Sequence, residues 1–305
     1  MGSGRDLPVL ALARTEMTAA RFTRFIAIDW SGAVGARQKG IAVAECHRGH
    51  DAPLLVRPGH IWSRGEVLDL ILGAGPDSLI GLDLGPALPF VDRGAYFPGW
   101  DDSPADARGL WALVDRICAD DPHFAASSFV DHPDAARHFR RHGGRVGDLF
   151  EPGRGRLRET ERAQQRMGLS PYSNLNLVGA AQVGKSSLTG MRLLNRLNGR
   201  VAIWPFDPLP DTGPVVIELY TTIAAIAAGR PRARSKMRSH ADLDAALVAL
   251  GSRPGGGAGP ITDHASDAIL TAAWMRIAAG APENWRPAGL TPEIARSEGW
   301  TFGVV

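Results

Sequence analysis

The chain has 305 residues, of which 44% are hydrophobic and 22% are charged, and its formal net charge is +2. These values are typical of a soluble globular protein and exclude a polycation. No apolar run approaches the length needed to cross a membrane. Cys46 and Cys118 lie far apart and form no CxxC pair, which argues against a disulfide framework and a structural zinc site. We therefore expect a cytoplasmic protein with no membrane partner.

The first part of the chain predicts a flexible leader followed by strands and one helix. Residues 1–22 form the expected leader, and residues 23–303 form one expected domain. Short apolar or β-branched runs predict strands over 25–29, 40–46, 54–56 and 78–83. Between them, residues 63–73 have helical spacing. Ser63 is the expected N-cap, and Glu66 completes a capping box.

The middle of the chain, residues 90–172, differs in composition from both flanks. It combines aromatic residues with many charges and has Gly and Pro breaks, so we interpret it as a long inserted helical and loop region. Within it, residues 111–118 and 134–141 are predicted to be helical.

The last part of the chain returns to regular elements. We predict helices over 187–197 and 262–279, the second N-capped by Thr262, and strands over 201–204 and 215–220. Residues 254–260 are rich in glycine and are expected to connect two elements. Alternation of strands and helices favours an α/β sheet covered by helices.

Acidic residues are the main functional signal. Asp29 and Asp83 each end an apolar strand, and although both also suit a turn, this position places a carboxylate at the rim of the sheet, where ligands of open α/β sheets bind. Asp263 and Asp267 are four residues apart near the start of the last predicted helix, so they share one face, and the helix dipole favours acids there. Glu218 lies inside an apolar strand and faces either this site or solvent.

Converging carboxylates raise one another's pKa values unless a cation joins them. Mg²⁺ or Mn²⁺ is the natural choice, because both prefer oxygen ligands. We predict that Asp29, Asp83 and Asp267 are catalytic metal ligands, and that Glu218 or Asp263 completes the site. His264 is interpreted as a surface residue at the helix start.

Four segments of this chain occur together, and in the same order, in a known family. They are residues 25–29, residues 80–83 followed by Pro86 and Pro89, residues 215–220, and residues 263–268. The ordered set resembles the DUF429 family of predicted nucleases with an RNase H-like fold, over roughly residues 24–303.

This resemblance implies a mixed five-stranded sheet, with the first three strands antiparallel and helices on its faces. It places acids on the first strand (Asp29), at the end of the fourth (Asp83) and on the last helix (Asp267), the order found in RuvC-like resolvases. In this chain the last acidic pair is spaced by four residues and not three, and Asp83 stands where other RNase H-like nucleases commonly carry Glu.

Basic residues suggest how a substrate is held. Nine arginines lie within residues 132–166. Such clusters either hold phosphates through bidentate contacts or form solvated helix faces. We predict metal-dependent phosphodiester hydrolysis of nucleic acid, with Ser31, Lys185, Arg137 and Arg141 contacting the substrate.

Two alternatives remain open. The segment from Gly179 to Ser186 matches the P-loop pattern, in which backbone amides and Lys185 hold nucleotide phosphates, although the strand expected before it is half polar. The second alternative is a non-catalytic scaffold in which the acids only terminate strands.

Overall fold

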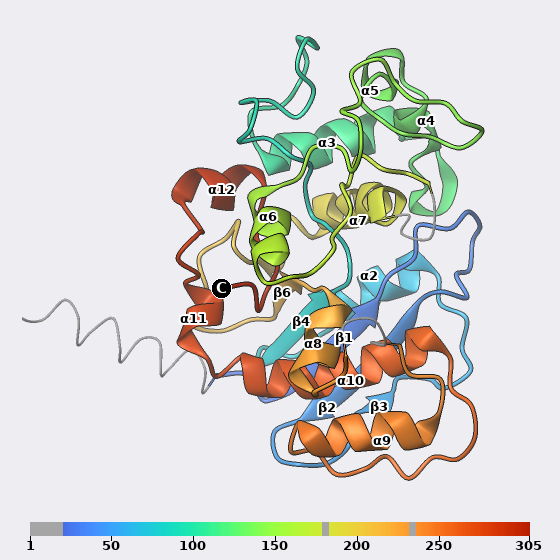
Figure 1. The fold of residues 1–305 in the computed structure, drawn as a ribbon, viewed down its shortest axis with the longest axis vertical. Coiled ribbons are helices and arrows are strands. Elements are labelled where there is room, and N and C mark those ends of the chain that lie inside the picture. Colours follow the sequence, from blue (N-terminus) through green and yellow to red (C-terminus); the bar gives the residue numbers. More distant parts are fainter. Residues whose placement is uncertain (1–20, 179–182, 232–235) are drawn as a thin grey trace, which may run out of the picture.

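A mixed sheet of six strands forms the centre of the molecule, and helices cover both of its faces (Figure 1). The structure is a computed structural model and describes residues 21–178, 183–231 and 236–305, so nearly all of the expected leader lies outside the described residues. The strand order is β3-β2-β1-β4-β6-β5. The strands are β1 (Arg24–Asp29), β2 (Ala42–His47), β3 (Leu54–Leu55), β4 (Ser78–Leu82), β5 (Ala202–Ile203) and β6 (Val215–Glu218).

Strand direction changes at β1. The first three strands are antiparallel, as expected, whereas β1, β4, β6 and β5 are parallel. The sheet has six strands where the family resemblance implied five. The additional strand is the two-residue β5, which lies within the strand predicted over 201–204 and pairs with β6 at the edge.

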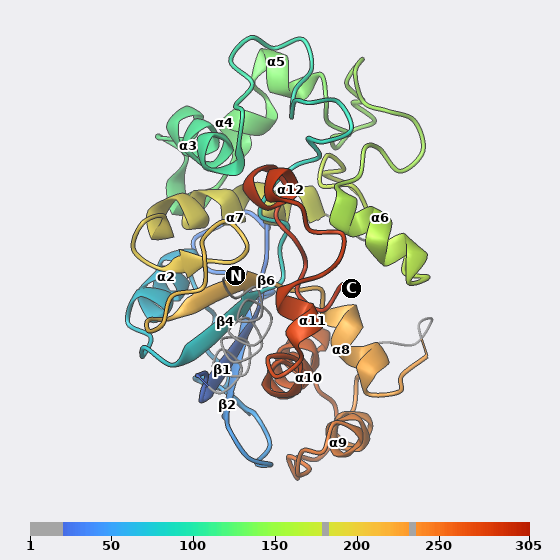
Figure 2. The same cartoon turned by 90° about the vertical axis from the view of Figure 1, so that its left-hand side faces the viewer.

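Each face of the sheet has its own hydrophobic core. Along β1, Ile26 and Ile28 pack on one side and Phe25 and Ala27 on the other, as side-chain alternation in a strand requires. The first core includes residues of α2 (Arg64–Leu72), α3 (Ala107–Ile117) and α7 (Val183–Leu197), and the second includes residues of α8 (Thr221–Ala227), α9 (His240–Ala249) and α10 (Asp263–Ala278). Figure 2 shows these two groups of helices on opposite sides of the sheet.

The predicted insertion is a run of short elements between β4 and α7. They are α3, η1 (Pro122–Phe124), α4 (Ser127–Val130), α5 (Pro133–Ala136) and α6 (Glu159–Arg166). The prediction of a helix over 134–141 is wrong beyond Ala136, where α5 ends. Arg140 instead exchanges backbone hydrogen bonds with Leu175 and Leu177, which draws the chain out of the helix.

The carboxyl-terminal part contains the best-predicted helix and several that were missed. Helix α10 spans Asp263–Ala278, and Thr262 caps it as expected. The strand expected over 215–220 ends at Glu218, and α8 begins at Thr221. The short helices α11 (Pro282–Trp285) and α12 (Pro292–Ser297) complete the fold. None of the described helices combines the length and apolar character that a membrane span needs.

Helix α2 begins with the predicted capping box. The Ser63 hydroxyl accepts from Glu66 N at 3.1 Å, and the Glu66 carboxylate accepts from Ser63 N at 2.7 Å. We expect Ser63→Ala to lower the free energy of unfolding by about 0.5–2 kcal/mol, whereas Ser63→Thr should lose much less because it keeps the cap. Urea unfolding measures both, and an equal loss in the two variants would contradict this role.

Candidate active site

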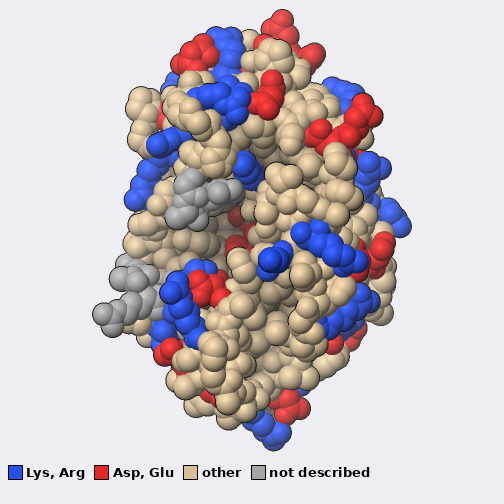
Figure 3. Space-filling model, turned by 90° about the vertical axis from the view of Figure 1, so that its right-hand side faces the viewer, with Lys and Arg blue, Asp and Glu red and all other residues tan. Residues whose placement is uncertain are grey.

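Three parallel strands deliver acidic residues to one edge of the sheet. In the register of β1, β4 and β6, Ile28 pairs with Leu82 and Leu82 pairs with Glu218. Asp29 and Asp83 therefore leave their strands beside Glu218, and Asp83 N donates to Ile28 O at 3.0 Å. A cavity of about 460 Å³ opens at this edge. Figure 3 shows acidic atoms at the bottom of a hollow on the molecular surface.

Helix α10 brings the third predicted aspartate to the same place. The helix packs across β1 and β2, and Asp267, one turn after the Thr262 cap, is only 6% exposed. Burial raises the pKa of Asp83 well above its usual range, and the negative charges of Asp29 and Asp267 raise it further. Asp29, Asp83 and Asp267 thus form one electrostatically coupled group, which we call the aspartate cluster.

Two basic side chains face the aspartate cluster. The Lys236 ammonium forms an ion pair with Asp267 Oδ2, and His264 Nδ1 lies 3.0 Å from Asp29 Oδ2. Burial raises the pKa of Asp267, although Lys236 opposes that effect. The hydrogen bond to Asp29 raises the pKa of His264.

The sequence analysis missed both of these contacts. His264 lies at the surface at the start of α10, as interpreted from the sequence, with a half-exposed side chain, and it also contacts Asp29. The available signals were its spacing of three residues from Asp267, which places both on one helix face, and the rarity of lysine, since Lys236 is one of three in the chain.

Glu218 has a different environment from the aspartate cluster. Its two carboxylate oxygens accept from the Arg158 guanidinium at 2.6 and 3.0 Å, and Oε1 also accepts from Thr301 at 2.8 Å. Arg158 also pairs with Glu161. Burial alone would lower the pKa of Arg158, but the charges of Glu161 and Glu218 raise this pKa above its usual value. Of the two orientations considered for Glu218, the solvated face is wrong, because the residue is buried and lines the cavity.

Asp263 lies at the edge of the site. It is partly exposed and pairs with Arg238 at 3.3 Å, while its charge contributes to the raised pKa of Asp267. The prediction that Asp263 or Glu218 completes a metal site stays a prediction, with Glu218 already engaged by Arg158.

The predicted substrate contacts are spread over three places. Ser31 lines the main cavity. Lys185 and Arg141 line a second cavity of about 180 Å³, which shares Gly32 and Ala33 with the first. Arg137 lies on the surface and pairs with Asp148 at 2.7 Å. The first four residues of the P-loop-like segment, 179–182, lie outside the described residues.

Much of the arginine cluster is occupied by intramolecular contacts. Arg156 is buried and binds Asp92 and three backbone carbonyl groups. Arg141 and Arg145 share Asp131. Several of these arginines therefore hold the inserted region together, a role that neither interpretation of the cluster included.

The aspartate cluster suits a hard divalent cation by its chemistry, since its ligand atoms would be carboxylate oxygens. As the side chains stand, no group of three His, Cys, Asp or Glu residues in the described ranges is arranged to hold a metal ion. Lys236 instead supplies positive charge, and Lys236 and His264 contact carboxylate oxygens for which a metal would compete.

Comparison of the chain with protein-family models, with curated proteins and with solved structures gives no match. The functional argument therefore depends on the geometry of the site itself.

Titration of Asp83 makes a prediction about stability. Because its folded-state pKa is raised, the folded protein binds more protons than the unfolded chain between the unfolded value of about 3.9 and the folded value. The free energy of unfolding should therefore fall as pH rises through this window. We expect Asp83→Asn, which carries no charge, to gain stability relative to wild type on going from about pH 5 to about pH 8 in EDTA. Urea unfolding measures the difference, and a difference independent of pH would contradict the raised pKa.

Proposed function

We propose that the chain has an RNase H-like fold and hydrolyses phosphodiester bonds of nucleic acid with Mg²⁺ or Mn²⁺ bound by Asp29, Asp83 and Asp267. The fold proposal is supported by the mixed sheet with three antiparallel strands at its start, which the resemblance to the DUF429 family implies. The functional proposal depends on one observation, which is the convergence of Asp29, Asp83 and Asp267 at the carboxyl ends of β1 and β4, where their charges raise the pKa of Asp83.

That observation favours a functional site over a set of strand-terminating turns. Aspartates that only terminate strands can turn into solvent, whereas these converge beside a cavity where each raises the cost of ionising the next. Proteins accept such a cost mainly at functional sites. By contrast, Glu218 has its own buried arginine and contributes to the cavity wall.

The chemistry that a divalent cation supplies in such a site is polarisation of a phosphoryl oxygen and activation of water. The residues of this chain prepare the site for it. Asp29, Asp83 and Asp267 would bind the ion, and Lys236 would hold Asp267 until then. If His264 donates from Nδ1 to Asp29, the proton that the imidazole gains on becoming charged is bound at Nε2. Because the pKa of His264 is raised, this proton stays bound to a higher pH than in a free histidine.

A cleavage assay tests the proposal. Labelled single-stranded and duplex RNA and DNA are incubated with wild type in Mg²⁺ or Mn²⁺, with EDTA as the metal-free control. We expect metal-dependent cleavage, and a fall of at least about 100-fold in the cleavage rate of Asp29→Asn and of Asp83→Asn. Residues that only hydrogen-bond to metal ligands already contribute about 10–100-fold, so loss of a ligand itself should cost at least as much.

Asp51→Asn is the matched control. Asp51 lies on the surface and pairs with Arg253, so its loss should leave the cleavage rate unchanged. Full activity of Asp83→Asn, or an equal loss in Asp51→Asn, would contradict the assignment. Asp263→Asn then decides whether Asp263 belongs to the metal site. If Asp263 is a metal ligand, this variant should lose as much activity as Asp29→Asn.

A further inference from the structure

The wall of the main cavity contains a buried carboxamide with an unused acceptor. Asn174 is 1% exposed and lines the cavity. Its Nδ2 donates to Ala87 O at 2.8 Å, whereas no donor in the described part of the chain reaches Oδ1. Buried side-chain acceptors usually have a partner, so an orphan such as Oδ1 needs an explanation.

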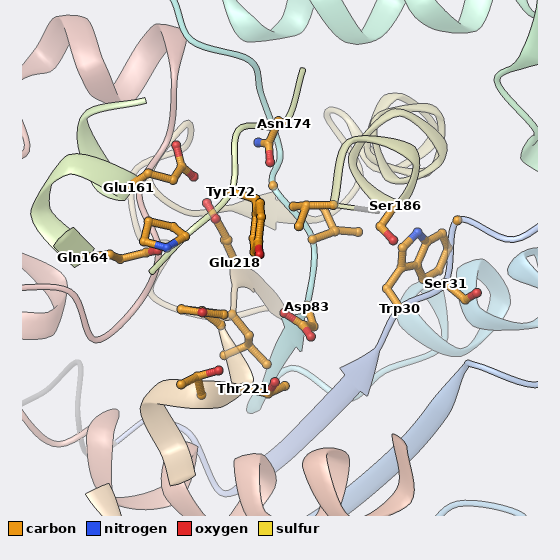
Figure 4. A pocket seen from close by; sticks show the side chains of 18 of the residues that line it. Trp30, Ser31, Asp83, Glu161, Gln164, Tyr172, Asn174, Ser186, Glu218 and Thr221 are labelled. Carbon is orange, nitrogen blue, oxygen red and sulfur yellow. The ribbon is translucent and has the colours of Figure 1, made fainter. Parts of the chain in front are cut away.

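The bond to Ala87 fixes which end of the carboxamide meets the cavity. Turning the amide over would set Oδ1 against the Ala87 carbonyl oxygen, so that two acceptors would face each other. Figure 4 shows the Asn174 oxygen directed toward the interior of the pocket.

Close packing holds Asn174 in place. A Cβ at Gly85 would lie 2.1 Å from Asn174 Nδ2, and a Cβ at Gly184 would lie 2.3 Å from Asn174 O. Gly85 follows Asp83 by two residues, and Gly184 lies in the first turn of α7. The acceptor is therefore fixed relative to the strand end that carries Asp83.

An aromatic ring accompanies this acceptor. Tyr172, two residues earlier, lines the same cavity and is 46% exposed. The Arg154 guanidinium lies 5.9 Å from the centre of the Tyr172 ring and donates to Pro171 O at 3.2 Å. An exposed ring supported in this way offers a face for a nucleobase.

We infer that Asn174 and Tyr172 form a nucleotide subsite beside the aspartate cluster, in which Asn174 Oδ1 accepts a hydrogen bond from the substrate. The choice of a nucleotide ligand rests on the proposed function. The oxygens of a phosphodiester only accept hydrogen bonds, so the donor belongs to the sugar or the base that flanks the phosphate. The donor is either a 2′-hydroxyl or a base amine, and Asn174 is a specificity-determining residue.

The test measures binding, not cleavage, so that it stands apart from the proposed hydrolysis. Fluorescence anisotropy with Ca²⁺ in place of Mg²⁺ compares three labelled oligonucleotides of equal length. They are oligo(rA), oligo(dA), which lacks the 2′-hydroxyl, and oligo(2′-deoxynebularine), which also lacks the adenine amine. We expect the affinity of wild type to fall about three- to tenfold either from oligo(rA) to oligo(dA) or from oligo(dA) to oligo(2′-deoxynebularine). A fall at the first step identifies the 2′-hydroxyl as the donor, and a fall at the second step identifies the base amine.

The variants assign that selectivity to Asn174. Asn174→Ala and Asn174→Leu should bind the two probes of the selective step equally, whereas the control Asn195→Ala should keep the wild-type ratio. Asn195 lies on α7, donates a hydrogen bond to Asp115 at 3.0 Å and does not line the cavity. Thermal unfolding of each variant checks that it is folded.

Two results would overturn the inference. One is equal binding of all three probes by wild type, which needs no variant, and the other is selectivity that survives in both Asn174 variants. Selective binding that depends on Asn174 without any cleavage in Mg²⁺ or Mn²⁺ would support the subsite and refute the hydrolysis alone.

Discussion

Parallel pairing of β1, β4 and β6 is the constraint on which the site depends. Because these strands run in one direction and end at one level, the acids that terminate them meet at a single edge of the sheet. Helix α10 then packs across β1 and β2 and adds Asp267 from the side. Repulsion among the aspartates follows from this geometry, and so does the need for positive charge beside them.

The chain meets that need in two different ways. Glu218 is neutralised by Arg158 in a buried network with Glu161 and Thr301, and breaking a buried pair of this kind is costly. Asp267 is paired with Lys236, whose side chain is half exposed. An ion pair open to solvent at the cavity is easier to replace, so the aspartate cluster is the place where a cation or a substrate can exchange with the protein's own charges.

Local patterns predicted the elements that carry the acids, and long-range contacts decided the rest. The strands ending at Asp29 and Asp83 and the helix capped by Thr262 were all visible as apolar runs with clear ends. The Arg158–Glu218 pair spans 60 residues, and Asn174 packs closely against Gly85 and Gly184, where a side chain would clash with it. No periodicity or capping signal records such contacts, because they are created by the path of the inserted region.

The central claim is that the aspartate cluster binds a divalent cation, and calorimetric titration of Mn²⁺ tests it most directly. Wild type and the surface variant Asp51→Asn are predicted to bind Mn²⁺ with the same affinity, and Asp83→Asn is predicted to lose that binding. Absence of binding to wild type, or equal binding to Asp83→Asn, would contradict the account.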